Sequence, residues 1–202
     1  MSPITHFFLS WTVANGGART RKDRFLVTAS GVVPDIDGLG AITDLLTRDT
    51  VQPLRLFDKY HHVLGHNLGF GIAIGVTTFC LATRRFTIGL LAIVSFHLHL
   101  VCDLIGSRGP DGYQWPIPYL LPFSDSVQLV WEGQWALNAW PNFAITIVAI
   151  IMSFYLAWRR GYSFLSLFST SADLALVSAL RARFGAPPTV SSLFRGRERG
   201  KG

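Results

Sequence analysis

The chain has 202 residues, of which 50% are hydrophobic and only 15% are charged. This composition is too apolar for an ordinary water-soluble domain, and the long apolar runs indicate a membrane protein. A net charge of +6 is compatible with nucleic-acid binding. The basic residues lie at the ends of the apolar runs, however, so membrane topology explains the charge better than a nucleic-acid partner does.

Apolar segments of two lengths follow one another along the chain. Short helices are expected over residues 4–14 and 25–33. At ~1.5 Å per residue, neither crosses a ~30 Å hydrocarbon core alone, so we expect a half-depth pair packed against longer helices. The longer apolar runs cover residues 68–82, 86–105 and 137–158, and the last of these is the clearest spanning segment.

The intervening segments have a different character. Residues 39–60 are mixed and polar, with one amphipathic turn around 42–46. Residues 107–136 are rich in Pro, Trp, Tyr and Gly, which suits a lid at the membrane–water interface. A weaker helix over 164–180 and a basic, disordered tail over 181–202 follow. We therefore predict an all-α, multi-helix membrane bundle, with one membrane-embedded domain over residues 1–180 and a cytoplasmic tail over 181–202.

The charges sort themselves to two sides if successive apolar segments alternate in direction. One side then holds 14 of the 18 basic residues and 3 of the 12 acidic residues, for a net charge of +11, and the other side has a net charge of −5. By the positive-inside rule the basic side is cytoplasmic. We therefore expect a multi-pass protein of the bacterial cytoplasmic (inner) membrane, with its acidic side extracytoplasmic.

The histidines, and the aspartates that lie in or next to apolar segments, are found toward the acidic side. His99 and Asp103 are four residues apart within an apolar run and share one helix face, where ionisable groups are costly and mark function. Counting residues from the basic ends places all six histidines in one layer with Asp35 and Asp37. Mixed imidazole and carboxylate groups are metal ligands. The predicted ligand set is His6, Asp35, Asp37, His61, His62, His66, His99 and Asp103.

Spacing leaves several roles open. On a regular helix His62 and His66 share a face, which favours that pair over His61 with His66, unless the chain there forms a non-helical turn. Asp35 and Asp37 follow Pro34 and also suit a plain turn. His97 lies ~160° around the helix from His99 and is expected to point away from the site.

The ordered motifs resemble a known family. They are an early histidine, Pro-Asp-Ile-Asp at 34–37, His61 followed by His66, His99 followed by Asp103, and Leu-Pro-Phe-Ser at 121–124. Residues 1–160 are similar in this respect to the bacterial inner-membrane-bound metal-dependent hydrolases of the YdjM type and, more remotely, to zinc-dependent phospholipase C and P1 nuclease. The resemblance implies His61 rather than His62 as a ligand, and a hydrolase activity.

These observations lead to a functional hypothesis. The donor set suits one to three divalent ions, with Zn²⁺ favoured and Mn²⁺ or Fe²⁺ as alternatives. A metal-activated water would cleave a phosphoester or related bond in a lipid or envelope substrate, with Asp35 and Asp37 as catalytic carboxylates. Four cations on that side could hold an anionic headgroup: Arg48, Arg55, Lys59 and Arg108. A non-catalytic metal-handling or regulatory membrane protein and a bis-histidine haem protein are the alternatives.

Overall fold

The computed structural model describes residues 1–109 and 112–188, with the side chain of residue 58 excepted. The regular elements in this part are helices, which confirms the expected all-α class. They are α1 (Pro3–Ala14), α2 (Arg21–Ser30), the 3-10 helix η1 (Val33–Leu39), α3 (Gly40–Thr47), α4 (Leu56–Tyr60), α5 (Leu68–Leu81), α6 (Arg85–Gly106), α7 (Trp140–Arg160), the 3-10 helix η2 (Phe164–Leu167) and α8 (Thr170–Phe184).

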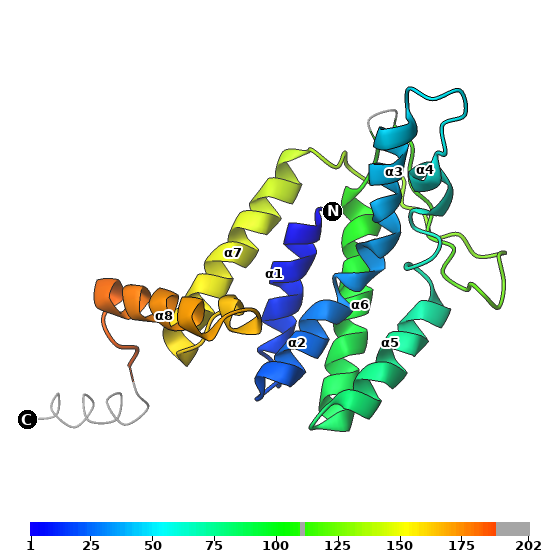
Figure 1. Ribbon diagram of the computed structural model, residues 1–202. Helices are drawn as coiled ribbons and strands as arrows, with labels where there is room; N and C mark the ends of the chain where they lie inside the picture. Colours follow the sequence, from blue (N-terminus) through cyan, green and yellow to red (C-terminus); the bar gives the residue numbers. More distant parts are fainter. Residues whose placement is uncertain (110–111, 189–202) are drawn as a thin grey trace, which may run out of the picture. The chain divides into compact units, whose positions relative to one another are not determined.

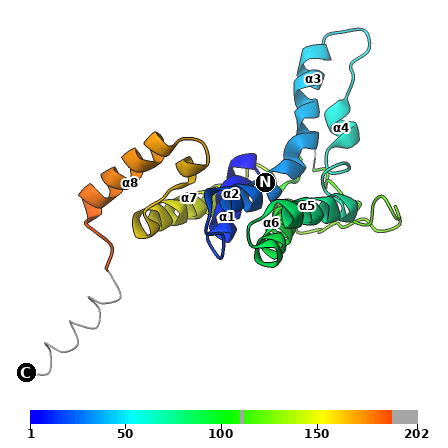
Figure 2. The ribbon, with the colours of Figure 1, turned by 60° about the horizontal axis from the view of Figure 1, so that its bottom comes forward.

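The chain divides into two compact units, Met1–Ile150 and the part from Ile151 onward. In the first unit α1, α2, α5 and α6 lie side by side (Figure 1), and α2 and α6 both contact α1. The hairpin of α3 and α4 projects away from the layer formed by α5 and α6 (Figure 2). In the second unit, the Asp173 carboxylate accepts a 2.7 Å hydrogen bond from the Ser163 hydroxyl and so ties the start of η2 to α8.

Two helices are long and apolar enough to cross a membrane, namely α6 and α7. The pair formed by α2 and the segment Val33–Thr47 passes the same test together, but it bends by 50° at its break. The short second segment expected from the sequence is therefore one arm of a broken span or re-entrant loop. Helix α5 is apolar but shorter than the two candidate spans.

Polar caps explain where several helices begin. The side chains of Ser2, Thr20 and Asn67 accept hydrogen bonds from the backbone N–H three residues later, at the starts of α1, α2 and α5. Helix α2 begins at Arg21, four residues before the segment predicted from the apolar run at 25–33. The Thr20 cap and the acidic Asp23 stabilise its first turn, so that turn needs no apolar residues.

Other boundaries also differ from the sequence prediction. The amphipathic turn around 42–46 is a full helix, α3, and α4 was not predicted at all. Two backbone N–H groups at the start of α4 donate to the Asp44 carboxylate, a contact made across a loop that local periodicity does not register. Helix α8 continues to Phe184, while residues 189–202 of the predicted tail lie outside the described part of the chain.

Small apolar side chains pack the end of the first unit near the basic residues. Its core there consists of Ala14, Ala18, Val27, Ala82 and Ile88. Small residues let membrane helices approach closely, where packing takes the place of the hydrophobic effect. The core beside the histidines is built from larger side chains: Phe96, Leu100 and Ile117 are buried together, and Ile117 belongs to the irregular segment after α6.

Residues 107–109 and 112–136 are irregular but attached to the bundle. Residues 117 and 129 form an isolated antiparallel bridge, and residues 108 and 136 form a parallel one. The Tyr119 and Leu121 carbonyl oxygens accept hydrogen bonds from the backbone N–H groups of Leu68 and Gly69. These contacts satisfy donors at the start of α5 and hold the segment over the end of the bundle where the histidines lie.

Candidate metal centre

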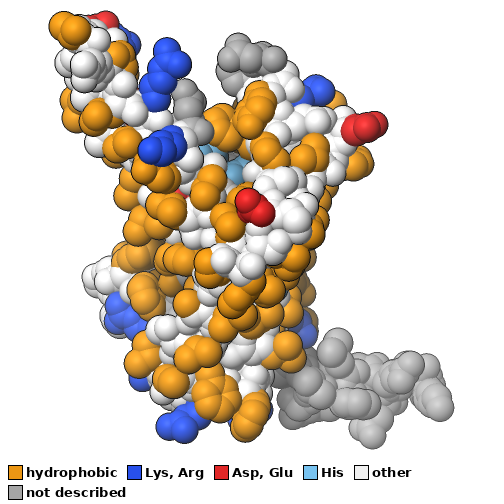
Figure 3. Space-filling view, turned by 90° about the vertical axis from the view of Figure 1, so that its right-hand side faces the viewer, with side chains coloured by type: hydrophobic (Ala, Val, Ile, Leu, Met, Phe, Trp, Pro, Cys, Tyr) orange, Lys and Arg blue, Asp and Glu red, His pale blue; other side chains and the backbone are white. Residues whose placement is uncertain are grey.

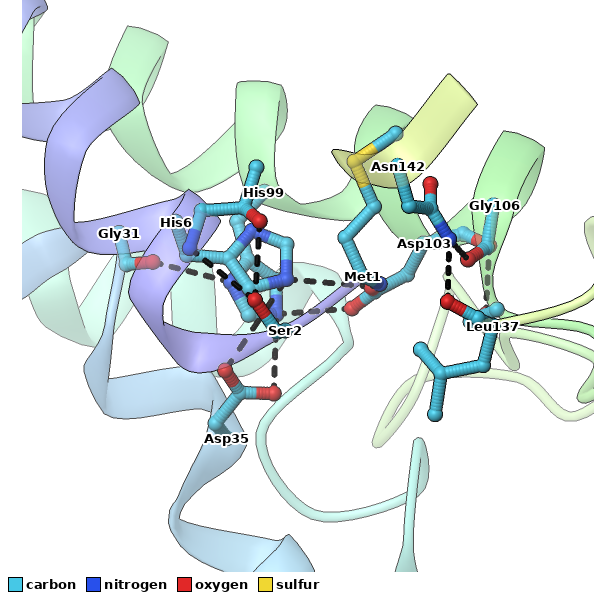
Figure 4. Close-up of polar contacts among 12 residues, drawn as sticks. Met1, Ser2, His6, Gly31, Asp35, His99, Asp103, Gly106, Leu137 and Asn142 are labelled. Carbon is cyan, nitrogen blue, oxygen red and sulfur yellow. Dashed lines mark hydrogen bonds and ion pairs between the residues drawn. The ribbon is translucent and has the colours of Figure 1, made fainter. Parts of the chain in front are cut away.

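Six of the eight predicted ligands converge at one end of the first unit. Ligand atoms of His6, Asp35, His99 and Asp103 all lie within 4.8 Å of one another, and so do those of His62, His66 and Asp103. The two groups share Asp103. Helix α1, η1, the 61–67 turn and α6 therefore each supply ligands to one cluster, part of which is shown in Figure 4.

Asp103 is the centre of the cluster. Its Oδ1 lies 3.2 Å from His6 Nε2, and its Oδ2 lies 3.0 Å from His99 Nε2 and 3.3 Å from His66 Nε2. The N-terminal amine of Met1 also contacts Oδ1. The two carboxylate oxygens thus contact different histidines, and Asp103 belongs to both ligand groups.

Asp35 closes the cluster from η1. Its carboxylate oxygens lie 3.8 Å from His99 Nε2 and 4.0 Å from His6 Nε2 (Figure 4). Its side chain is 13% exposed, against 2% for Asp103. Asp35 is therefore the carboxylate of the cluster with the most access to solvent.

The outer nitrogens of three histidines are fixed by acceptors. His99 Nδ1 lies 2.9 Å from the Gly31 carbonyl oxygen, and His62 Nδ1 lies 3.4 Å from the Trp115 carbonyl oxygen. Since a carbonyl oxygen only accepts, each Nδ1 carries a hydrogen and each ring turns its Nε2 toward the cluster. Metal-ligating histidines in proteins are oriented in this way.

Asp37 performs the same task for His66. Its carboxylate lies 3.1 Å from His66 Nδ1 and 3.2 Å from His61 Nδ1, and it accepts a hydrogen bond from the Gly65 N–H. Asp37 and His61 belong to neither ligand group. These two predicted ligands thus lie one layer outside the cluster, where Asp37 contacts the outer nitrogen of His66 and His61 contacts Asp37.

The turn at 61–67 explains how adjacent histidines differ. The residues His61 to Asn67 are not helical, so the face-sharing argument for His62 and His66 does not apply. His62 has a φ of 66°, a left-handed conformation that is uncommon for a side-chain-bearing residue. This backbone reversal lets the His62 ring face Asp103 while the His61 ring stacks on Phe57 at 4.3 Å.

His97 lies apart, as its position on the helix predicts. Its Nδ1 is 2.9 Å from the Ile93 carbonyl oxygen and its Nε2 is 2.9 Å from the Tyr119 hydroxyl. Both ring nitrogens are satisfied, so this histidine ties α6 to the segment 107–136.

The electrostatics of the turn favour cations. Burial alone would lower the pKa of His66, but the hydrogen bonds and charges of Asp103 and Asp37 outweigh it and raise the pKa to about 9. Burial lowers the pKa of His62 to about 3, and the Asp103 charge only partly opposes this. The carboxylates therefore stabilise a positive charge on the His66 ring, whereas the His62 ring is neutral.

The residues present fit a divalent metal. Two buried polar atoms of the cluster, His6 Nδ1 and Asp35 Oδ2, have no hydrogen-bond partner among the described residues. His66 Nε2 and His99 Nε2 lie 3.0 Å apart, a contact that needs one proton or a cation because two unprotonated nitrogens would repel. A divalent cation in place of that proton would also satisfy the orphaned Asp35 oxygen.

A cavity opens beside His61, outside the cluster. It has a volume of about 380 Å³ and is lined by residues from the 59–63 and 113–128 segments, including His61, Trp115 and Lys59. Figure 3 shows histidine surface at the floor of a hollow. Sequence reasoning missed the backbone contributors Gly31, Gly65 and Trp115, because a carbonyl or N–H leaves no side-chain signal.

The fold and the cluster define the class of protein: a helical membrane protein with a buried His/Asp group at one end of its first unit. The chain belongs to the YdjM inner membrane protein family, whose model matches residues 1–183. The protein is accordingly embedded in a lipid bilayer. No curated protein and no solved structure matches the chain.

Proposed function

We propose that this protein is a metal-dependent hydrolase that cleaves a phosphoester or related bond in a lipid or envelope substrate. The observation that carries the proposal is the double ligand group with Asp103 in common. Histidine and carboxylate donors in this number suit Zn²⁺, or Mn²⁺ and Fe²⁺. The resemblance of the motif order to inner-membrane-bound metal-dependent hydrolases supports the same class.

The position of each residue suggests its role in the proposed site. His6, His99 and Asp35 would hold one ion, His62 and His66 a second, and Asp103 would join both. Bound divalent ions lower the pKa of water to roughly 7 and stabilise charge on a phosphoryl group. Asp35, the most exposed carboxylate of the cluster, is placed to accept a proton from water. Asp37 is a positioning residue, since it contacts the outer nitrogen of His66.

One observation favours a second candidate, a non-catalytic metal-handling or regulatory protein. The side chains of His6, His66 and His99 have no exposed surface, and closed sites are typical of structural metals. Haem fits poorly, because the 3.0 Å between His66 Nε2 and His99 Nε2 leaves no room for a porphyrin between them.

The test combines metal content with activity. Protein purified in detergent is loaded with zinc or manganese, and metal is counted by elemental analysis beside hydrolysis of a chromogenic phosphodiester and of labelled phospholipids. We expect metal and turnover in the wild type, less metal and no turnover in Asp35→Asn, and neither in His99→Ala. His97→Ala is the matched control and should keep both. Protein that binds metal but cleaves none of these substrates supports the metal-handling alternative, and protein that takes up no metal overturns both.

A further inference from the structure

A second cavity lies on the flank of the cluster that α1 and α7 share. It has a volume of about 720 Å³ and is lined by Ser2, Arg108, Gly109, Gly112, Ala136, Leu137, Asn138, Asn142, Phe143 and Thr146. This volume is in the range of small-molecule sites. The residues that line it all belong to the first unit.

The cavity is amphipathic. One part of its lining is polar, with Ser2, Asn142 and Thr146 held in place by a chain of hydrogen bonds: Thr5 Oγ1 lies 2.6 Å from Thr146 Oγ1 and 2.9 Å from Ser2 Oγ. The other part is apolar, and its Leu137 and Phe143 side chains are 52% and 60% exposed. A ligand that fits both parts has a polar head and a hydrocarbon portion.

Arg108 supplies the charge. Its N–H donates to the Trp135 carbonyl at 3.1 Å, and its own carbonyl accepts from the Leu137 N–H at 3.0 Å, so its backbone is fixed on both sides. Its side chain makes no ion pair with any carboxylate in the described part of the chain. An arginine with a fixed backbone and no carboxylate partner among the described residues suits a phosphate oxygen.

The cavity lies at the depth of a lipid headgroup. Phe143 and Thr146 belong to the first turns of α7, a candidate membrane span, and exposed Trp140 begins that helix. Tryptophan at the end of a span marks the membrane–water interface. An acyl chain leaving the cavity past Phe143 would continue along the apolar face of α7, where Ile147 is 55% exposed.

We propose that this cavity binds an anionic phospholipid, with its phosphate on Arg108 and its first acyl carbons on Leu137 and Phe143. Asn142 donates a 2.7 Å hydrogen bond to the carbonyl of Gly106, three residues after Asp103, so the lipid is held beside the cluster (Figure 4). The role of this lipid as a substrate rests on the proposed function. Its binding does not, and the two are tested separately.

Lipid binding is measured by native mass spectrometry of the detergent-solubilised full chain titrated with phosphatidylglycerol or phosphatidylcholine. We expect the wild type to prefer phosphatidylglycerol, and Arg108→Gln to lose about tenfold in affinity for it and the preference with it. Phe143→Ser should weaken both lipids. Arg48→Gln is the matched control, since Arg48 is exposed and already paired with Asp49, and it should bind like the wild type.

Two further arms separate the alternatives. His99→Ala should bind lipid as the wild type does even if it holds no metal, so a failed hydrolase proposal leaves this one standing. Arg108→Lys, with its charge kept, should retain most of the preference and guards against a folding defect in Arg108→Gln. Equal binding of the two lipids by the wild type, or an unaffected Arg108→Gln, overturns the proposal. Displacement of the lipid by inorganic phosphate at equal concentration reassigns the site to free phosphate and overturns it too.

Discussion

His66 Nε2 and His99 Nε2 lie 3.0 Å apart, although 33 residues separate them in the chain. One comes from a turn and the other from the middle of a candidate span, and each is oriented by an acceptor at its outer nitrogen. Such a contact is stable only with a proton or a metal ion between the rings and the carboxylates.

His66→Ala and His99→Ala should each lower zinc affinity by more than about 100-fold, because each removes a side chain that binds the metal directly. Loss of a residue that only orients a ligand typically costs about 10–100-fold. Isothermal titration with zinc in detergent measures the loss. His97→Ala removes a histidine of the same helix that bonds Ile93 and Tyr119 instead, and its affinity should equal that of the wild type. Equal losses in His97→Ala and His99→Ala would show that α6 was merely destabilised.

Asp37→Asn should lower metal affinity by about 10–100-fold while the protein stays folded, because the amide is a weaker acceptor for His66 Nδ1. The same titration measures it, with Asp49→Asn as control, since the Asp49 side chain is 87% exposed. A loss as large as that of His66→Ala would instead make Asp37 a direct ligand.

Metal affinity should rise with pH between 7 and 9. The pKa of His66 is raised to about 9, so below that pH a proton on the ring competes with the metal, and binding releases it. One displaced proton gives about a tenfold gain in apparent affinity per pH unit in this window. His62, with its pKa lowered to about 3, is already neutral and adds no proton. Titrations in buffers of different ionisation enthalpy count the protons released, and a count of zero at pH 7 contradicts the assignment.

Gly31→Ala should destabilise the first unit by about 1–3 kcal/mol, the usual range for overpacking. An added Cβ would lie 1.9 Å from Ser10 Oγ and 2.6 Å from Ser95 Oγ, where α2 meets α1 and α6. Thermal unfolding in detergent measures the effect. The double variant Gly31→Ala, Ser10→Gly lacks the closer of the two clashes, the one with Ser10, and should regain part of the stability. Metal affinity should fall in parallel, because the Gly31 carbonyl orients His99.

The metal end should face away from the cytoplasm. In a chain whose two cysteines are replaced by serine, a single cysteine at Asp49 should react with a membrane-impermeant maleimide in intact cells that have a permeabilised outer membrane. A single cysteine at Arg84, on the basic side, should react only after the inner membrane is disrupted. The reverse pattern of labelling would invert the proposed orientation.

Much of the cluster was predictable because charged groups in apolar segments are conspicuous. His99 and Asp103 share a helix face whatever packs against them, and caps such as Asn67 place α5 where the apolar run begins. The assignment of His61 and His62 was not predictable. It depends on the left-handed backbone at His62, and helical spacing cannot describe a turn.

The sequence by itself determined the helical class and the apolar segments, and it predicted that histidines and aspartates from several of these segments meet. These follow from periodicity and from the cost of burying charge, which act locally along the chain. Only the tertiary structure decided which atoms face one another. It made Asp103 the shared carboxylate and moved Asp37 outside the cluster, because contacts between η1, the 61–67 turn and α6 join residues that no local spacing relates.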